Sequence, residues 1–313
     1  MTTVDIRVAS LASRWHGQGR TADLSGPVHW VDFGAPRRDD LAPVVLVHGL
    51  GGSHLDWVRI APDLARRRHV VALDLPGFGL TPAAGRRTTV HADARLVGRF
   101  VAEVLGRPAV LVGNSMGGMI VVLLAAERPE LVVGLGLLDP SVPLHHRRQD
   151  PLVAAEFALF SLPYLNRAYL ERNRRRLTAE EQVRRTLELC FADDSRIDPE
   201  VLDADIALLE YRADLPGTDR DFLGAARSLL RVLARGRRYA ARIRSIDRPV
   251  LLVHGEQDRL VPFSAALATA AANPAWETFF LPGVGHVPHL EVPDLVLGRL
   301  VPWLHRLRAA PAA

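Results

Sequence analysis

The stretch Val-Leu-Val-Gly-Asn-Ser-Met-Gly-Gly-Met, residues 110–119, constrains the fold more than any other part of this sequence. Three apolar residues suited to a buried strand lead into Gly-x-Ser-x-Gly, and an apolar run suited to a buried helix follows as far as Ala126. A serine on such a sharp turn stands exposed at the carboxyl edge of a sheet, and only small residues fit two places before and after it. Gly113 and Gly117 fill those places, so Ser115 is a candidate nucleophile.

Length and composition indicate a large folded domain. The chain has 313 residues, of which 48% are hydrophobic, and this suits one large α/β domain with an insertion, or two domains. There is no run of about 18 apolar residues and no basic start followed by an apolar stretch, so we expect neither a membrane span nor a secretory signal. Cys190 is the sole cysteine, which excludes an internal disulfide and fits a reducing compartment. We therefore expect a cytoplasmic protein.

The basic residues raise the question of a nucleic-acid partner, because all 39 of them are arginine. The formal net charge is only +4, since acidic residues are interspersed along most of the chain. The one dense basic cluster, 172–176, is accompanied by Glu171, Glu180 and Glu181. Dispersed charge of this kind is typical of a solvated surface, so we expect no nucleic-acid binding.

Alternating apolar runs and helical spacings predict a parallel sheet with helices on both faces. Strands are expected at 28–33, 44–47, 69–73, 108–112 and 132–138, and helices are expected from a Ser53 cap through Leu64, at 90–105 and after Ser115. A further strand is expected at 4–8. It would form an antiparallel edge pair with 28–33 across a loop rich in Gly, Arg and Ser.

The strand at 44–47 ends in His-Gly-Leu-Gly-Gly-Ser, residues 48–53. A strand that ends in a glycine-rich turn leaves backbone N–H groups unpaired, and these can point at an anionic oxygen. This turn is therefore the candidate oxyanion-binding loop for a reaction at Ser115.

From 141 to 245 the alternation of strands and helices breaks. No clear strand is found there, and helical stretches are expected at 151–170, 179–190, 200–211 and 221–234. About 100 residues are far too many for a structureless connection, so the segment should be a folded helical insertion. Because it follows the carboxyl end of a strand, it should lie as a cap over the edge where Ser115 is exposed. The domains are then a core, 1–140 with 246–313, and a cap, 141–245.

One part of the insertion is strongly apolar. It presents Phe157, Leu159, Phe160, Leu162, Tyr164 and Leu165 close together in the sequence. These side chains form either the core of the cap or the wall of a substrate pocket, and one residue can serve both purposes. We expect the pocket to be largely apolar.

The alternation resumes with strands expected at 249–255 and 276–281. Asp258 lies just past the carboxyl end of the first strand, and His286 lies just past the end of the second. The carboxyl ends of parallel strands meet at one edge of a sheet. Ser115, Asp258 and His286 can therefore converge at that edge.

The order serine, aspartate, histidine is the order that a nucleophile elbow predicts, and here the sequence resembles the α/β-hydrolase superfamily. The resemblance covers nearly the whole chain and is to the serine-nucleophile branch with a helical cap, which includes carboxylesterases and lipases. The matching motifs, in order, are His48-Gly49, 74–79 (Asp-Leu-Pro-Gly-Phe-Gly), 113–118 (Gly-Asn-Ser-Met-Gly-Gly), 255–258 (Gly-Glu-Gln-Asp) and Gly285-His286. The implied fold is α/β, with a mostly parallel, doubly wound sheet and an inserted helical cap.

The resemblance also implies roles for five residues. His286 is the base that removes the Ser115 proton, and Asp258 fixes the tautomer of that histidine. The backbone N–H groups of Leu50 and Met116 bind the developing oxyanion. No cofactor and no metal are expected.

Other residues compete for these roles. Asp139 also follows a strand, and some members of the superfamily place their acid there. His289 lacks the Gly-His turn context and is expected to be a structural histidine that forms hydrogen bonds. His54, His145 and His146 have no convincing metal-ligand spacing with carboxylates, so we expect them to be surface or cap histidines.

A serine at the elbow argues against dehalogenases and epoxide hydrolases, which need a carboxylate nucleophile there. A serine triad under a helical cap suits hydrolysis of a carboxylic ester, and we expect a neutral, largely apolar ester of short to medium acyl length. The alternative is hydrolysis of a carbon–carbon bond in a ring meta-cleavage product. That branch shares Gly-Asn-Ser-Met-Gly-Gly, but it typically has a Trp where this chain has Val287. A non-catalytic ligand-binding relative is a third hypothesis, which the presence of all three triad residues disfavours. The oligomeric state stays open.

Overall fold

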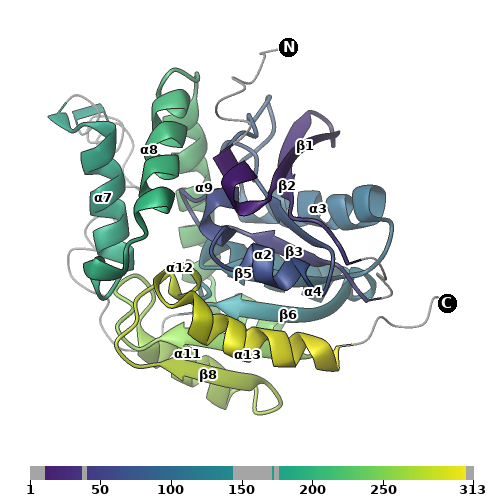
Figure 1. Cartoon of the computed structure of the whole chain (residues 1–313). Coiled ribbons are helices and arrows are strands. Elements are labelled where there is room, and N and C mark those ends of the chain that lie inside the picture. Colours follow the sequence, from purple (N-terminus) through teal and green to yellow (C-terminus); the bar gives the residue numbers. More distant parts are fainter. Residues whose placement is uncertain (1–10, 37–40, 144–170, 173–175, 308–313) are drawn as a thin grey trace.

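The computed structural model describes residues 11–36, 41–143, 171–172 and 176–307, and in this part of the chain eight strands form one sheet (Figure 1). The strands are β1 (Gln18–Asp23), β2 (Pro27–Asp32), β3 (Val44–Val47), β4 (Val70–Leu73), β5 (Ala109–Asn114), β6 (Val132–Leu138), β7 (Val250–Gly255) and β8 (Glu277–Leu281). Their order in the sheet is β1-β2-β4-β3-β5-β6-β7-β8. The first two pairs are antiparallel and the other five are parallel.

The central parallel strands are apolar and covered on both faces. Every residue of β3, β4, β5 and β7 is buried, as expected for parallel strands between two layers of helices. Successive side chains alternate between two cores. Val44 and Leu46 pack into one core, and Val45 and Val47 pack into the other. The prediction of a mostly parallel sheet with helices on both faces is confirmed.

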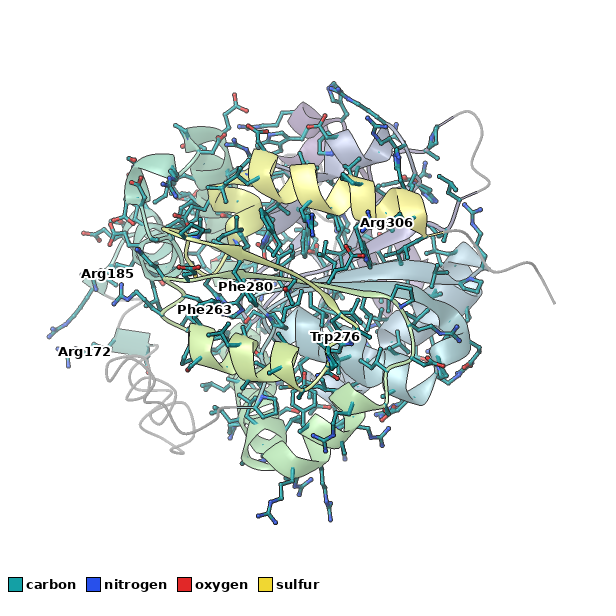
Figure 2. The ribbon with its side chains drawn as sticks, turned by 90° about the horizontal axis from the view of Figure 1, so that it is seen from below. Arg172, Arg185, Phe263, Trp276, Phe280 and Arg306 are labelled. Atoms are coloured by element: carbon teal, nitrogen blue, oxygen red, sulfur yellow. The ribbon has the colours of Figure 1, made fainter. Side chains whose placement is uncertain are left out.

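Helices from distant parts of the sequence form the two layers. The first core includes side chains from η1 (Leu11–Trp15), η2 (His54–Trp57), α2 (Ala61–Ala65), α12 (Pro288–Glu291) and α13 (Pro293–Arg306). The second includes side chains from α3 (Val90–Arg99), η3 (Phe100–Leu105), α4 (Met116–Glu127) and α11 (Phe263–Ala271). At the β8 edge, Phe263 meets Phe280 edge to face, with ring centroids 5.0 Å apart (Figure 2).

The antiparallel edge pair differs from the prediction. The strand expected at 28–33 is present as β2, but its partner is β1, within the segment expected to be a loop. β1 lies at the edge of the sheet and has no buried residue, so its sequence lacks the apolar alternation that would have revealed it. The strand expected at 4–8 lies outside the described residues.

The helix expected from Ser53 through Leu64 is divided into η2 and α2. Ser53 caps η2 by accepting the Leu55 N–H at 3.0 Å, and Asp56 completes the capping box. Pro62 occupies the first turn of α2 and has no N–H to bond back to the preceding turn, so one continuous helix cannot form. The helix expected at 90–105 is present, with a π-helical final stretch, η3.

The segment after β6 is helical, as expected. Its described helices are α7 (Ala179–Cys190), η5 (Asp194–Arg196), α8 (Pro199–Ala213), α9 (Thr218–Ala234) and α10 (Gly236–Arg244). α7 and α8 lie side by side (Figure 1). α9 contacts α3, and α10 contacts α4. The sequence did not predict α10 as a separate helix, and the stretch expected to be helical at 151–170 lies outside the described residues. No described helix combines the length and the apolar composition needed to cross a membrane.

Candidate active site

Ser115 lies on the turn between β5 and α4 in a strained backbone conformation. Its φ is 54° and its ψ is −118°, in a region that residues other than glycine rarely adopt. The turn is tight because Gly117 lies against the end of β3. A Cβ atom on Gly117 would be 2.1 Å from the Val47 carbonyl oxygen, so only glycine fits at this position. The resulting elbow leaves Ser115 partly exposed at the carboxyl edge of the sheet.

The structure brings His286 and Asp258 together at the same edge. His286 Nδ1 and Asp258 Oδ2 are 2.7 Å apart, and both side chains are buried. The other carboxylate oxygen of Asp258 accepts the N–H groups of Leu260 at 2.8 Å and Val261 at 2.9 Å. Three donors thus bind the carboxylate of Asp258 and hold it in one orientation next to the imidazole.

Electrostatics favour the ionised form of Asp258. Burial raises the pKa of this carboxyl, but the attraction and the hydrogen bond of His286 outweigh burial, and the pKa of Asp258 is lowered overall. An ionised Asp258 can only accept at Oδ2, so the proton of a neutral His286 resides on Nδ1. Nε2 of His286 is then the nitrogen free to take a proton.

Asp139, the competing acid, lies behind Asp258 and is not joined to His286 by a hydrogen bond in the described structure. Its Oδ1 accepts the Gly255 N–H at 2.8 Å. Burial, and after it the charge of Asp258, raises the pKa of Asp139 well above its usual value, which favours the uncharged form of this carboxyl. His254 lies beside the pair, 3.5 Å from Asp258 Oδ2 and 3.6 Å from Asp139 Oδ1. The sequence did not single out His254.

The glycine-rich loop after β3 lies next to Ser115. A Cβ atom on Gly49 would be 3.2 Å from Ser115 Cβ, and Leu50 follows directly. His48 holds the loop from below, because its Nδ1 donates to the Gly49 carbonyl at 2.7 Å and its Nε2 accepts from Leu75 N–H at 3.0 Å. Burial lowers the pKa of His48 to about 4, so the neutral tautomer that makes both bonds persists at neutral pH.

The two N–H groups expected to bind an oxyanion have few competing acceptors. Met116 is the first residue of α4, so its N–H has no acceptor within the helix. In the described part of the chain, the Leu50 N–H donates to no backbone carbonyl. The positive end of the α4 dipole lies at the same place and favours negative charge near Ser115.

Asn114, which the sequence did not identify, links the elbow to the turn that carries His286. Its Nδ2 donates to the carbonyl oxygens of His286 and of Leu138, each at 3.0 Å. Ser115 Oγ itself makes no hydrogen bond among the described residues, so Asn114 provides the connection between the serine and histidine turns. The signal in the sequence was a polar residue at the end of an apolar strand, directly before the serine.

His289 is buried against Trp57 rather than placed as a base. The two rings stack with centroids 4.5 Å apart and an interplanar angle of 25°. Burial, followed by the nearby His286, lowers the pKa of His289 to about 3. Neither ring nitrogen has a hydrogen-bond partner among the described residues, so the expected hydrogen-bonding role is wrong and the contact is a stacking one.

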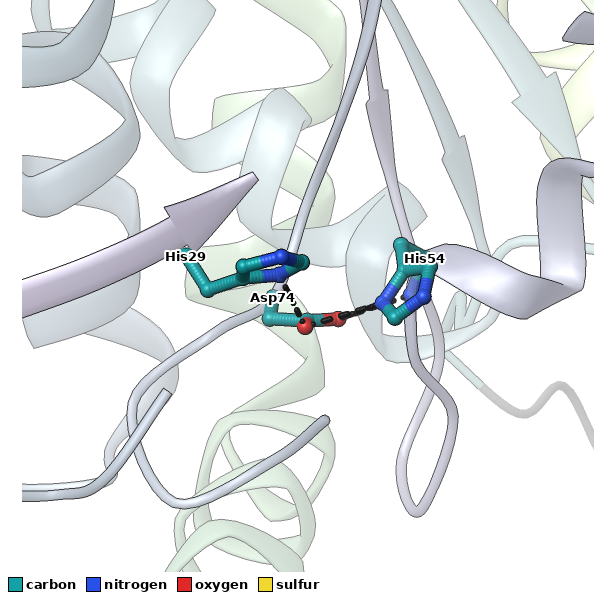
Figure 3. A group of neighbouring side chains, drawn as sticks. All are labelled: His29, His54 and Asp74. Carbon is teal, nitrogen blue, oxygen red and sulfur yellow. Dashed lines mark hydrogen bonds and ion pairs between the residues drawn. The ribbon is translucent and has the colours of Figure 1, made fainter. Parts of the chain in front are cut away.

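A second histidine–carboxylate group joins β2, η2 and the loop after β4 (Figure 3). His29 Nδ1 lies 2.8 Å and His54 Nδ1 2.9 Å from Asp74 Oδ2. Asp74 also accepts the backbone N–H groups of His54 at 2.7 Å and Leu80 at 2.8 Å. These separations are hydrogen-bond lengths and the donors fill the carboxylate, so the group fits a structural anchor better than a metal site.

His54 is therefore a buried anchor, and the expectation of a surface or cap histidine is wrong for it. Burial raises the pKa of Asp74, but the two histidines outweigh burial and hold that pKa well below its usual value. His145 and His146 lie outside the described residues.

Comparison with known proteins identifies the family. The family model described as the alpha/beta hydrolase fold matches residues 42–293, which is most of the chain. The chain belongs to the α/β-hydrolase family.

Three curated relatives of this α/β hydrolase span most of its length. Uncharacterized hydrolase YugF of Bacillus subtilis (strain 168) is 29% identical and covers 86% of this chain and 91% of the relative. Pimeloyl-[acyl-carrier protein] methyl ester esterase of Edwardsiella ictaluri is 26% identical, and the match covers 85% of this chain and 92% of the relative. 2-Hydroxymuconate semialdehyde hydrolase of Pseudomonas sp. (strain CF600) is 28% identical, and the match covers 73% of this chain and 74% of the relative.

Solved structures support the fold. The structure of lip1 from Acinetobacter baumannii AYE matches this α/β hydrolase with a TM-score of 0.75 over 97% of each chain, at 22% sequence identity. At this level of identity the match establishes the architecture and does not assign a substrate.

Replacing Gly117 by alanine should destabilise the fold by at least about 3 kcal/mol, because the new Cβ would meet backbone oxygens that cannot move independently. It would lie 2.1 Å from Val47 O and 2.5 Å from His48 O. Gly298→Ala is the control, because Gly298 lies within α13 with no neighbour within 4 Å and alanine favours a helix. Thermal denaturation followed by circular dichroism measures both. Equal midpoints for the two variants would contradict the tight elbow.

Proposed function

We propose that this α/β hydrolase cleaves carboxylic esters, with Ser115 as nucleophile, His286 as general base and Asp258 as the acid that orients it. The observation that carries the proposal is the 2.7 Å hydrogen bond between His286 and Asp258, at the same sheet edge as the strained turn of Ser115. The relative that acts on a methyl ester, the pimeloyl-[acyl-carrier protein] esterase, supports the same reaction class.

In the proposed mechanism, Ser115 Oγ attacks the ester carbonyl carbon while His286 Nε2 takes its proton. The resulting oxyanion accepts hydrogen bonds from the N–H groups of Leu50 and Met116. Collapse of the tetrahedral intermediate breaks the bond to the alcohol oxygen, which receives the proton from His286. Water then attacks the acyl carbon while His286 takes its proton, and collapse of this second intermediate breaks the bond to Ser115 Oγ. His286 returns the proton to Oγ, which releases the acid product and restores Ser115.

The charges around His286 suit this cycle. Asp258 is ionised and stabilises the imidazolium that forms after each proton transfer. Burial raises the pKa of Asp139, which favours its uncharged form, and burial lowers the pKa of His254, which favours the neutral imidazole. In the proposed cycle His286 carries the proton.

We propose that 141–245 is a cap on a core made of 1–140 and 246–313. The start and the end of α8 both bind the core. Asp198 forms an ion pair with Arg59, and Arg212 donates to the carbonyl oxygens of Gly79 at 2.7 Å and Gly77 at 2.5 Å. These contacts join α8 to loops that follow the carboxyl ends of β3 and β4, which supports its assignment to the proposed cap.

A neutral, apolar ester of short to medium acyl length is the proposed substrate class. Phe222 of α9 and Leu50 both pack against the buried pair Leu223 and Ala226, and a Cβ atom on Gly51 would be 3.5 Å from the Phe222 ring. An apolar side chain from the proposed cap thus borders the oxyanion loop. The apolar stretch that supports the same proposal from the sequence, 157–165, lies outside the described residues.

Hydrolysis of a carbon–carbon bond is the alternative, and the relative named 2-hydroxymuconate semialdehyde hydrolase favours it. The substrates of that branch carry a carboxylate. Asp56, next to the oxyanion loop, has a pKa raised to about 7, mainly by burial, and burial also raises the pKa of Asp205 on α8. Arg212, which reaches the same region, already binds two carbonyl groups. A substrate carboxylate would therefore meet the carboxyl groups of Asp56 and Asp205 and an arginine that is already bonded. This, together with Val287 where the carbon–carbon hydrolases typically have Trp, favours the neutral ester.

We propose a cytoplasmic location, which the single cysteine supports. Intact hydrogen bonding of the acid–base pair favours an enzyme over a non-catalytic ligand-binding relative.

Ser115→Ala should abolish covalent labelling by a fluorophosphonate probe and lower kcat by on the order of 10⁴ or more, since nucleophile and base act as one unit. Ser245→Ala is the control, because its exposed hydroxyl bonds only to a backbone carbonyl. Probe labelling and ester hydrolysis are measured on protein with a native circular dichroism spectrum. Undiminished labelling of Ser115→Ala would remove Ser115 from the proposal.

Asp258→Asn should lower kcat by about 10³ to 10⁴, because an amide facing His286 favours the wrong tautomer. Asp139→Asn should cost far less, since asparagine resembles a neutral carboxylic acid and tolerates the φ of 44° at this position. Steady-state kinetics of the two variants give the ranking. The reverse ranking would assign the acid to Asp139.

Extending the acyl chain from two to six carbons should raise kcat/KM by up to about two orders of magnitude, because each buried methylene contributes about 0.8 kcal/mol. The gain should then stop at the end of the pocket. The measurement compares p-nitrophenyl acetate, butyrate, hexanoate and decanoate with a ring-cleavage dienone acid. A flat or falling ester series together with rapid turnover of the dienone acid would replace esterase activity by carbon–carbon cleavage.

A further inference from the structure

Glu291, at the end of α12, is a fully buried carboxylate behind the turn that carries His286. Its Oε2 accepts the backbone N–H of Gly285, the residue before His286, at 2.7 Å. Its Oε1 accepts the backbone N–H of Asp193 at 3.1 Å, and Ala192 N–H lies 3.2 Å from both oxygens. One side chain therefore binds the histidine turn and the inserted segment at the same time.

The fourth donor to Glu291 is a cation from the same inserted segment. Arg196 Nη1 lies 3.1 Å from Glu291 Oε1 and also donates to the carbonyl oxygen of Gly283 at 2.9 Å. Burying a carboxylate is costly unless donors surround it, and here three backbone N–H groups and one guanidinium do so. The arrangement requires an acceptor with two oxygens at this position.

The inserted segment also contacts the histidine turn directly. The backbone N–H of His286 donates to the carbonyl oxygen of Cys190, the last residue of α7, at 2.6 Å. A Cβ atom on Gly285 would lie 2.2 Å from that same oxygen, so the two turns are in close contact. The segment 190–196 thus supports His286 in two ways. Cys190 accepts the His286 N–H directly, and Glu291 links the segment to Gly285, the residue before His286.

We propose that Glu291 is a positioning residue, which holds the His286 turn against residues 190–196 and so makes alignment of the base depend on the inserted helices. The proposal rests on the function proposed above. Asn114 and Asp258 fix the carbonyl and the ring of His286, while Glu291 fixes the peptide that precedes it. The inserted segment is then part of the support of the active site as well as its cover.

Glutamine at position 291 tests this role with almost no change in shape. Its amide has one acceptor oxygen and two donors, so at least one of the N–H groups that now face Glu291 would meet another N–H. The Gly285 peptide should shift, and the imidazole of His286 should move relative to both Asp258 and Ser115. Removing the buried negative charge also disfavours the protonated imidazole.

The experiment uses the full chain with Glu291→Gln, and Glu277→Gln as the matched control. Glu277 lies on the edge strand β8 and pairs with exposed Arg306. Active sites are counted by fluorophosphonate titration, so kcat with p-nitrophenyl butyrate refers only to correctly folded protein. We expect Glu291→Gln to lower kcat per titrated site at least tenfold, with KM changed by less than about threefold. The acid limb of its kcat/KM profile should move to lower pH.

A spectroscopic signal separates this proposal from the proposed function. The proton on His286 Nδ1 bonds to Asp258 and should give a downfield resonance in proton NMR, which needs no turnover. We expect that resonance to shift or broaden in Glu291→Gln and to stay unchanged in Glu277→Gln. If the wild-type protein hydrolyses no ester, the proposed function fails, and this resonance still tests the positioning role.

Arg196→Ala keeps the test decisive if Glu291→Gln does not fold. The Arg196 side chain is partly exposed, and its loss leaves the backbone donors to Glu291 in place. We expect kcat per site to be two- to tenfold lower and the same resonance to be displaced. Unchanged kcat per site, acid limb and resonance in the folded variants, with only a lower melting temperature, would overturn the proposal and leave Glu291 a purely structural role.

Discussion

The backbone conformation of Ser115 is the constraint on which the rest of the site depends. A residue other than glycine at φ 54° costs about 1–3 kcal/mol, so its neighbours must hold it there. The Ser115 N–H donates to Leu138 at the end of β6 at 3.1 Å, and its carbonyl accepts from Ser141 at 3.0 Å. On the other side, Gly117 packs against Val47 at the end of β3. Three parallel strands must therefore end at one level, and the loops that follow them must meet around the serine.

Burial shifts the pKa values of several groups around Ser115 and His286 so that their uncharged forms are favoured. Burial lowers the pKa of His48 to about 4 and that of His289 to about 3, so both rings are uncharged at neutral pH. Burial and the charge of Asp258 raise the pKa of Asp139, which favours its uncharged form. The lowered pKa of Asp258 has the opposite consequence: its stabilising effect is present above its ordinary pKa of 3.8 and is lost as pH falls below the folded value. Above that value, the ionised Asp258 attracts the protonated form of His286.

Apolar strand patterns and motif order sufficed to predict the parallel sheet, the helical segment after β6 and the convergence of Asp258 with a histidine. They could not predict β1, whose exposed position at the sheet edge leaves no apolar alternation. Asn114 and Glu291 were missed for a different reason. Each makes a hydrogen bond to a residue far along the chain, Asn114 to His286 172 positions away and Glu291 to Arg196 95 positions away, and no local periodicity records such a bond. His54 was misplaced on the surface because its partner, Asp74, lies on another loop.

The contacts of the inserted helices set a limit on how a cap could open. α8 is bound to the core at both ends, through Asp198 and Arg212, and the end of α7 is bound through Cys190 to His286. A movement that lifts α7 away from the core must break the 2.6 Å bond from the His286 N–H and the bonds to Glu291. Opening at this end would therefore release the proposed base from its alignment. Under the proposed function, substrate entry that preserves the arrangement of the site must use a part of the proposed cap other than the junction of α7 with the His286 turn.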